Sequence, residues 1–199
     1  MSPTTHLLAS WIVAAKTTNN PRDCALVTWA GVLPDLDGLG LVTDLFNQAV
    51  FHRHTEYYQQ YHHYLTHGLP GAVVIVGALT CFARQRLRVA VLALLTFHLH
   101  LLCDFVGSRG PELTDKWPIF YLAPFRPRPM WVCQWQWRLD GWQNMVISLA
   151  LFIWAMSMAL KRGDSFISVF SRKADAVFVA TMTRWWNSLR PPKPSRVES

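Results

Sequence analysis

Apolar residues recur every three or four positions along much of this chain, which is the spacing of a helix with one buried face. Thr4 or Thr5 is expected to cap a first helix, and the pattern predicts helices over residues 4–15, 22–32, 44–51 and 55–65. The stretch GVLPDLDGLG, at 31–40, contains Pro34 and nearby glycines. It is predicted to be a loop that holds Asp35 and Asp37 on irregular backbone.

Three almost uninterrupted apolar segments follow, at residues 69–83, 89–106 and 145–160. A helix of 15 residues is about 22 Å long, whereas the apolar core of a bilayer is about 30 Å thick. Two interpretations remain open: a multi-pass membrane protein with short or tilted spans, or an all-helical globule with buried helices. The arginines at 84–88 and the basic pair 161–162 flank these segments and favour the membrane.

Two later segments each allow two interpretations. Residues 117–142 are rich in Trp, Phe, Tyr and Pro, as in a loop packed on the core or in an interfacial rim that touches lipid. Residues 166–189 form an amphipathic pattern, which suits a helix lying on an anionic membrane or one docked on its own domain. We therefore expect a helical domain over 1–162 and a basic helix with a tail over 163–199.

Composition narrows the class of protein. With 51% hydrophobic and 16% charged residues in 199, the chain is too apolar for a disordered protein. Its four cysteines form no C-x-x-C pair, which excludes a zinc finger and argues against a disulfide scaffold. Most of the net charge of +7 falls after residue 160, and no nucleic-acid motif is found, so no nucleic-acid partner is expected.

Candidate metal ligands lie at the ends of the apolar segments. His100 and Asp104 are four residues apart and share a helix face, in a run where a carboxylate is costly unless it is paired or bound to a cation. His98 points to the other face and is expected to be a neighbour. Asp35 and Asp37 can converge on one ion or serve only as turn residues.

A cluster of histidines and one early histidine complete the set. His63 and His67 would share a face of a continuous helix, but a break near Gly68 would let His62 reach inward instead. His52 and His54 are expected at the surface. The apolar stretch 7–15 has no basic residue before it, so no secretory signal is expected and His6 is retained. Imidazole and carboxylate ligands suit zinc, manganese or iron(II), and more than four of them suggest two ions.

In order and spacing these motifs resemble those of the YdjM-type family of bacterial inner-membrane metal-dependent hydrolases. The landmarks are His6, the L-P-D-x-D of residues 33–37, the His-rich segment ending at His67, the H-x-x-x-D of His100 and Asp104, and the G-S-R-G-P at 107–111. The resemblance covers about residues 4–142. It departs from the family at 63, 64 and 68, where His, Tyr and Gly replace the Arg, Gly and Ser of an H-R-G-x-T-H-S segment.

The family is in turn similar to the zinc-dependent phospholipase C and single-strand nuclease fold. The resemblance implies an all-α, membrane-associated bundle with a metal site between helices. One or two divalent ions, zinc first and manganese or iron second, would be held by His6, Asp35, Asp37, His62 or His63, His67, His100 and Asp104. A metal-activated water would cleave a phosphoester, a small molecule or a phospholipid. Asp35 and Asp104 would be catalytic, with Arg109 binding a phosphoryl oxygen.

Two other classes of function stay open. One is a non-enzymatic membrane protein whose metal is structural or regulatory and which binds a protein partner, and the other is a soluble helical metalloprotein. For the membrane interpretation we expect a multi-pass protein of the bacterial inner membrane. Because the basic turn at 84–88 should face the cytoplasm, the metal site at the other end of the flanking segments would face the periplasm.

Overall fold

The computed structural model describes residues 1–62, 64, 66–126 and 128–189. Over these residues the regular structure is helical, and the β pairings found there are two isolated bridges, Arg109 with Arg138 and Ile119 with Trp131. The predicted all-α class is confirmed.

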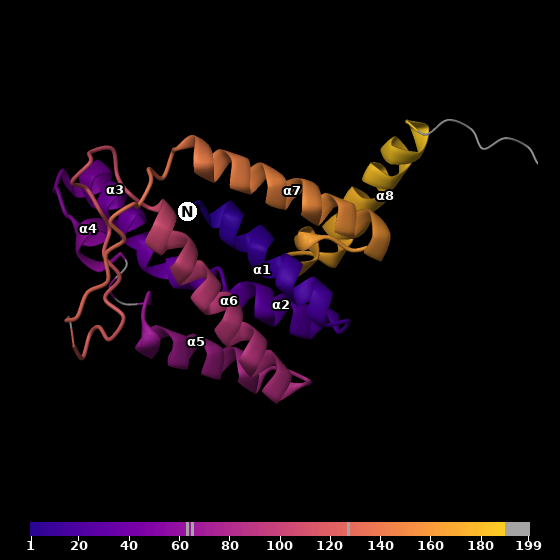
Figure 1. The fold of residues 1–199 in the computed structure, drawn as a ribbon, viewed down its shortest axis with the longest axis horizontal. Helices are drawn as coiled ribbons and strands as arrows, with labels where there is room; N and C mark the ends of the chain where they lie inside the picture. Colours follow the sequence, from indigo (N-terminus) through magenta and orange to yellow (C-terminus); the bar gives the residue numbers. More distant parts are fainter. Residues whose placement is uncertain (63, 65, 127, 190–199) are drawn as a thin grey trace, which may run out of the picture.

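Two helices at the start of the chain form the centre of the bundle (Figure 1). α1 (Pro3–Thr17) is capped by Ser2, two or three residues before the predicted cap, because the Ser2 hydroxyl accepts a backbone N–H and Pro3 fits the first turn. α2 (Pro21–Ala30) begins behind Asn20 in the same way. α1 packs against α2 and α7, and its Trp11 is fully buried.

The segment after α2 differs from its prediction. Residues 31–40 are not an irregular loop, because they contain a 3-10 helix, η1 (Leu33–Leu39), that runs directly into α3 (Gly40–Phe51). The helix predicted over 55–65 is a short one, α4 (Tyr57–Tyr61). It ends where the side chain of the next residue, His62, bonds to Asp37 of η1, so a tertiary contact replaces further helical turns.

Three apolar helices correspond to the three apolar segments: α5 (Leu69–Cys81), α6 (Arg86–Gly107) and α7 (Trp142–Arg162). α6 and α7 are longer than their apolar runs because basic and aromatic residues extend the ends. At 22 and 21 residues they are about 31–33 Å long, enough to cross a bilayer. α2 together with 33–51 forms a pair bent by 50° that is a third candidate span.

The link between α6 and α7, residues 108–141, contains no helix in the part that the structure describes, 108–126 and 128–141, and carries most of the predicted aromatic segment. Tyr121 and Trp131 stack at 4.8 Å between ring centroids, while Phe125 and Trp135 are more than four-fifths exposed. Some rings of this segment therefore pack on the protein, and others face outward, while contact of the outer rings with lipid stays a prediction.

The amphipathic pattern of 166–189 is divided into η2 (Phe166–Val169) and α8 (Arg172–Ser188). The division occurs because the Ser171 hydroxyl caps a new helix and buried Asp175 binds back to Ser165. α8 projects from one end of the bundle (Figure 1), and Val177 and Trp185 of its apolar stripe stay exposed. The predicted boundary between 162 and 163 falls at the end of α7, where Gly163 adopts a left-handed conformation.

The bundle has two chemically different ends. α6 and α7 run in opposite directions between them, joined by the link 108–141 (Figure 1). At one end the first turns of α1, the end of α6 and η1 come together. At the other end, hydrogen bonds from Arg88 to Thr17 and from Arg162 to Ala15 join the basic ends of α6 and α7 to α1.

Candidate metal centre

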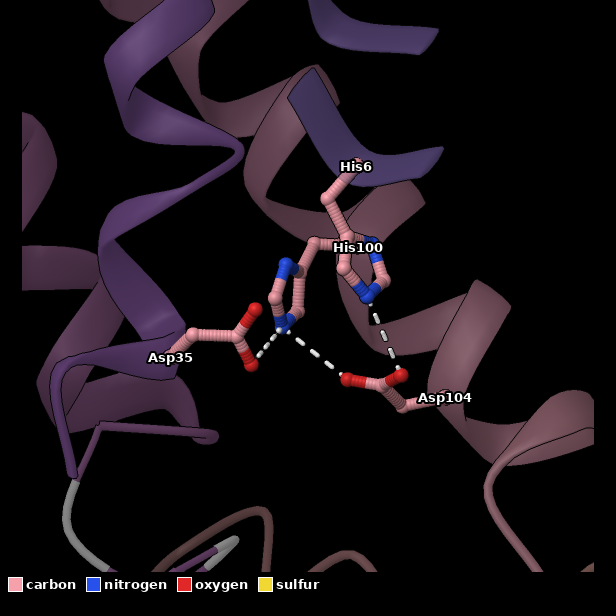
Figure 2. Close-up of side chains that lie close together, drawn as sticks. All are labelled: His6, Asp35, His100 and Asp104. Carbon is pink, nitrogen blue, oxygen red and sulfur yellow. Dashed lines mark ion pairs between the residues drawn. The ribbon is translucent and has the colours of Figure 1, made fainter. Parts of the chain in front are cut away.

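Four buried or half-buried side chains from three elements converge at the first of these ends (Figure 2). His6 comes from the first turns of α1, Asp35 from η1, and His100 and Asp104 from successive turns of α6. The i to i+4 spacing on α6 puts the last two side chains on one face, as predicted. One ligand atom from each of the four lies within 4.8 Å of the others, a separation at which all four could hold one ion.

The contacts inside this group are short and involve atoms that ligate metals. His100 Nε2 lies 3.0 Å from Asp104 Oδ2 and 3.5 Å from Asp35 Oδ1 (Figure 2). His6 Nε2 lies 3.2 Å from Asp104 Oδ1, the other oxygen of the same carboxylate. Asp104 therefore faces His100 with one oxygen and His6 with the other, as a carboxylate shared by two neighbouring positions would.

His67, between α4 and α5, reaches the same group. Its Nε2 lies 3.1 Å from His100 Nε2, 3.5 Å from Asp104 Oδ2 and 3.7 Å from Asp35 Oδ1. In a tetrahedral site with metal–ligand bonds of about 2.0–2.1 Å, ligand atoms lie about 3.3–3.4 Å apart. The five measured separations among these four atoms, 3.0 to 3.7 Å, are centred on that value.

The hydrogen bonds that His67 and His100 make through Nδ1 leave their Nε2 atoms facing each other. The Gly31 carbonyl can only accept, so His100 Nδ1 donates to it at 2.9 Å, and His67 Nδ1 similarly bonds to the Asp37 carboxylate at 3.0 Å. In the neutral rings both Nε2 atoms then carry lone pairs that face each other at 3.1 Å. A proton or a metal ion must lie between them to remove this repulsion.

Burial and charge in the group agree with that requirement. Burial lowers the pKa of His67, but contacts with the carboxylates of Asp104, Asp35 and Asp37 outweigh it and raise the pKa well above its usual value. Burial also lowers the pKa of His6, which favours the neutral ring that a metal needs. Among the described residues, His6 Nδ1 and Asp35 Oδ2 are buried without a hydrogen-bond partner. The donor set therefore fits a divalent cation.

A second group of possible ligands adjoins the first. Asp37, His62 and His67 also have ligand atoms within 4.8 Å of one another. Asp37 is buried between the two imidazoles and contacts His62 Nδ1 at 2.8 Å. The candidate ligands expected from the sequence thus lie in two adjoining groups, and His67, a member of the second, also contacts the first.

A cavity of about 400 Å³ opens beside the centre. Asp35 and Asp104 lie at its floor, and its walls include His62, Tyr58 and Trp117. Asp35 is the accessible member of the centre, with 21% of its side chain exposed. The amino group of Met1 and the Ser108 hydroxyl also line the cavity and both contact Asp104.

Several predicted residues lie elsewhere. Arg109 is not brought to the centre, because its guanidinium donates to the backbone carbonyls of Gln136 and Glu112 and so holds the 108–141 link. His98 bonds to Tyr121 on the other face of α6, as predicted. His52 and His54 are exposed, also as predicted. His63, the alternative to His62, lies outside the described residues.

Sequence reasoning missed three partners of the site. Ser108 is four residues after Asp104, so the i to i+4 rule that linked His100 to Asp104 could also have indicated it. Tyr58 stacks on His62 at 4.6 Å between ring centroids, and its place in the aromatic, His-rich segment was a weaker signal. The Gly31 carbonyl carries no side-chain signal, because every residue offers the same acceptor.

Comparison with known proteins gives one clear relationship. A family model described as YdjM inner membrane protein matches residues 1–185. No curated protein matches, and no solved structure matches. Because the match covers nearly the whole described chain, together with the apolar helices and every candidate ligand, the protein belongs to the YdjM inner membrane protein family.

Proposed function

We propose that this protein is a metal-dependent hydrolase of the inner membrane that cleaves a phosphoester. The observation that carries the proposal is the set of four atoms from Asp35, His67, His100 and Asp104, whose five measured separations are those of tetrahedral ligands. Two of these residues, Asp35 and Asp104, line a cavity. A structural metal site is closed, whereas a catalytic one leaves room for water and substrate. The cavity at Asp35 supplies that room.

The ion would be zinc, with manganese or iron as alternatives, because the donors are imidazole nitrogens and carboxylate oxygens. When bound, it would supply Lewis-acid activation of water and of the phosphoryl group. The protein's own residues would hold and orient the ligands. His100 is locked in its ligating tautomer by the Gly31 carbonyl, and Asp104 is steadied by the Ser108 hydroxyl at 2.9 Å.

The walls of the cavity favour a substrate with an apolar part. Leu39, Leu139 and Trp117 line it beside the polar floor. The adjoining helix α3 has no buried residue, and its apolar side chains Leu41, Val42, Leu45 and Phe46 are exposed. Such an exposed apolar helix suits contact with lipid. A phosphoester in the head group of a membrane lipid would meet the centre while its chains stay in the bilayer.

We also propose that the centre faces the periplasm. Lys161, Arg162 and the arginines 84, 86 and 88 flank the two long helices at the end opposite the centre. Positive residues beside membrane spans favour the cytoplasmic side. The centre, at the other ends of α6 and α7, would then be external.

Metal analysis and an activity panel test this proposal. Protein purified in detergent should contain about one to two zinc ions per chain and hydrolyse a phosphodiester or phospholipid, and Asp104→Ala should lose both metal and activity. Asp140→Ala is the matched control, because Asp140 is exposed and pairs only with Arg138 among the described residues. Zinc without hydrolysis of any substrate would favour the structural or regulatory alternative with a protein partner. Absence of metal in the wild type would overturn the proposal.

A further inference from the structure

We infer that Asp37 is a positioning residue that fixes His67 through its Nδ1 atom, and that it is not a ligand of a separate ion. This inference rests on the proposed metal centre. It divides the His and Asp residues into those that would bind the ion and those that orient the ligands. Two arrangements compete, because His67 is grouped with Asp37 and His62, while its Nε2 also lies within 3.7 Å of atoms of the first group. The contacts of Asp37 and His67 decide between them.

The first argument is that Asp37 already uses both oxygens. Oδ1 bonds to His62 Nδ1 at 2.8 Å, and Oδ2 bonds to His67 Nδ1 at 3.0 Å and to the backbone N–H of Thr66 at 3.3 Å. The side chain is only 1% exposed. A buried carboxylate is stabilised by such donors and does not require an ion.

The second argument is that a neutral imidazole has a single lone pair. His67 Nε2 lies within 3.7 Å of atoms of Asp35, His100 and Asp104, so its lone pair is directed at the first group. Nδ1 must then carry the proton, and it is the atom that faces Asp37. If Asp37 held an ion, that ion would need the same nitrogen to lose its proton, and His67 would have to bridge two metals as an imidazolate.

The third argument concerns what the contact does. A carboxylate that accepts the N–H of a ligating histidine fixes the ring's tautomer and orientation and makes it a better ligand. His100 receives the same support from the Gly31 carbonyl. The Nε2 atoms of the two rings lie 3.1 Å apart, and the Nδ1 atom of each ring donates to an acceptor on the segment 31–37. The same Asp37 also holds His62 at the cavity wall, where it stacks on Tyr58.

Zinc titration of the full chain in detergent tests the inference. We expect Asp37→Asn to keep the wild-type number of ions per chain while its zinc affinity falls roughly 10- to 100-fold, the range for outer partners of metal ligands. Asp44→Asn is the matched control: this carboxylate also holds the α4 segment, through Thr55 and Tyr58, but contacts no described imidazole. Its zinc affinity should equal that of the wild type.

A double-mutant cycle gives a readout that a merely structural role would not move. If Asp37 acts through His67, Asp37→Asn should weaken zinc binding in the wild type and have no further effect in His67→Ala. If Asp37→Asn does not fold, as judged by circular dichroism, Asp37→Glu retains the charge and should give a smaller loss of affinity with the same coupling to His67.

Three results would overturn the inference. Loss of one ion per chain in Asp37→Asn, with the remaining ion bound as tightly as before, would make Asp37 a ligand of a separate site. If Asp37→Asn left zinc affinity unchanged, or weakened it equally with and without His67, Asp37 would not act by positioning His67. A wild type that binds no zinc would overturn the proposed function as well, which distinguishes that failure from the other two.

Discussion

The Nε2 atoms of His67 and His100 face each other at 3.1 Å inside the protein. The two residues come from different elements, and their rings are 0% and 1% exposed, so water cannot separate them. Each ring is held by a hydrogen bond on its far side, and neither can turn away without breaking it. At the scale of single residues, buried hydrogen bonds therefore fix the two Nε2 atoms in positions where they can share a proton or bind one ion.

Removing one of these nitrogens should abolish tight metal binding. We expect His100→Ala to lower zinc affinity by more than the roughly 10- to 100-fold typical of outer partners, because a direct ligand is lost. Isothermal titration of zinc into the purified protein measures this. His98→Ala is the control, since His98 lies two residues away on the other face of α6. Equal losses in the two variants would contradict a centre built on His100.

At the scale of elements, the centre depends on a close approach of three helices. Gly31, just after α2, lies against Ser10 of α1 and Thr96 of α6. A Cβ at Gly31 would be 1.9 Å from Ser10 Oγ and 3.1 Å from the Thr96 carbonyl oxygen. The missing side chain lets the Gly31 carbonyl reach His100, so packing and ligand orientation are set by the same residue.

A methyl group at residue 31 should therefore disturb both the packing of the three helices and the orientation of His100. Gly31→Ala is expected to lower the free energy of unfolding by about 1–3 kcal/mol, the usual effect of overpacking, and to weaken zinc binding. Thermal unfolding in detergent and zinc titration measure the two effects.

Two control variants separate the effect of the close contact from the effect of the substitution itself. A Cβ added at Gly77 in α5 would have no described atom within 4 Å apart from its chain neighbours and the backbone of its own helix. Gly77→Ala should therefore not destabilise the protein. Ser10→Gly combined with Gly31→Ala removes the nearest clash and should recover part of the loss. If Gly31→Ala melted like Gly77→Ala, the close approach would not matter.

At the scale of the whole molecule, the candidate metal centre and the basic residues that flank the start of α6 and the end of α7 lie at opposite ends of the bundle. The carboxylates and imidazoles of the centre lie at one end, beside the link 108–141, which also contains five basic residues. The arginines at 84–88 and the basic pair 161–162 lie at the other end, where Asp23 binds the backbone N–H groups of Arg84 and Gln85. α6 and α7 connect the ends with two lengths of apolar helix. A membrane around this apolar zone would leave the two ends in different compartments.

Labelling from one side of the membrane tests this orientation. In a variant with the four native cysteines replaced by serine, Leu113→Cys in the 108–141 link should react with an impermeant maleimide added to intact cells. Leu87→Cys at the start of α6 should react only after the membrane is opened. Both positions are about four-fifths exposed, so access and not burial decides the outcome. The reverse pattern would put the centre in the cytoplasm.

The sequence determined the helical class, the approximate positions of the apolar helices and most of the candidate ligands, because periodicity and hydropathy are local properties of the chain. The spacing of His100 and Asp104 predicted a shared face, and the structure has it. The order of motifs predicted the family. The 3-10 helix at 33–39 and the break before α8 were missed, since both depend on contacts made with distant or capping residues.

Only the tertiary structure decided how the ligands meet. The spacing of the chain could not assign the Nδ1 atom of His67 to Asp37, give the Gly31 carbonyl to His100, or turn Arg109 away from the centre. Each of these outcomes depends on which atom of one segment faces which atom of another. The sequence supplies the chemical groups, but direction in space arises only when helices far apart in the chain pack together.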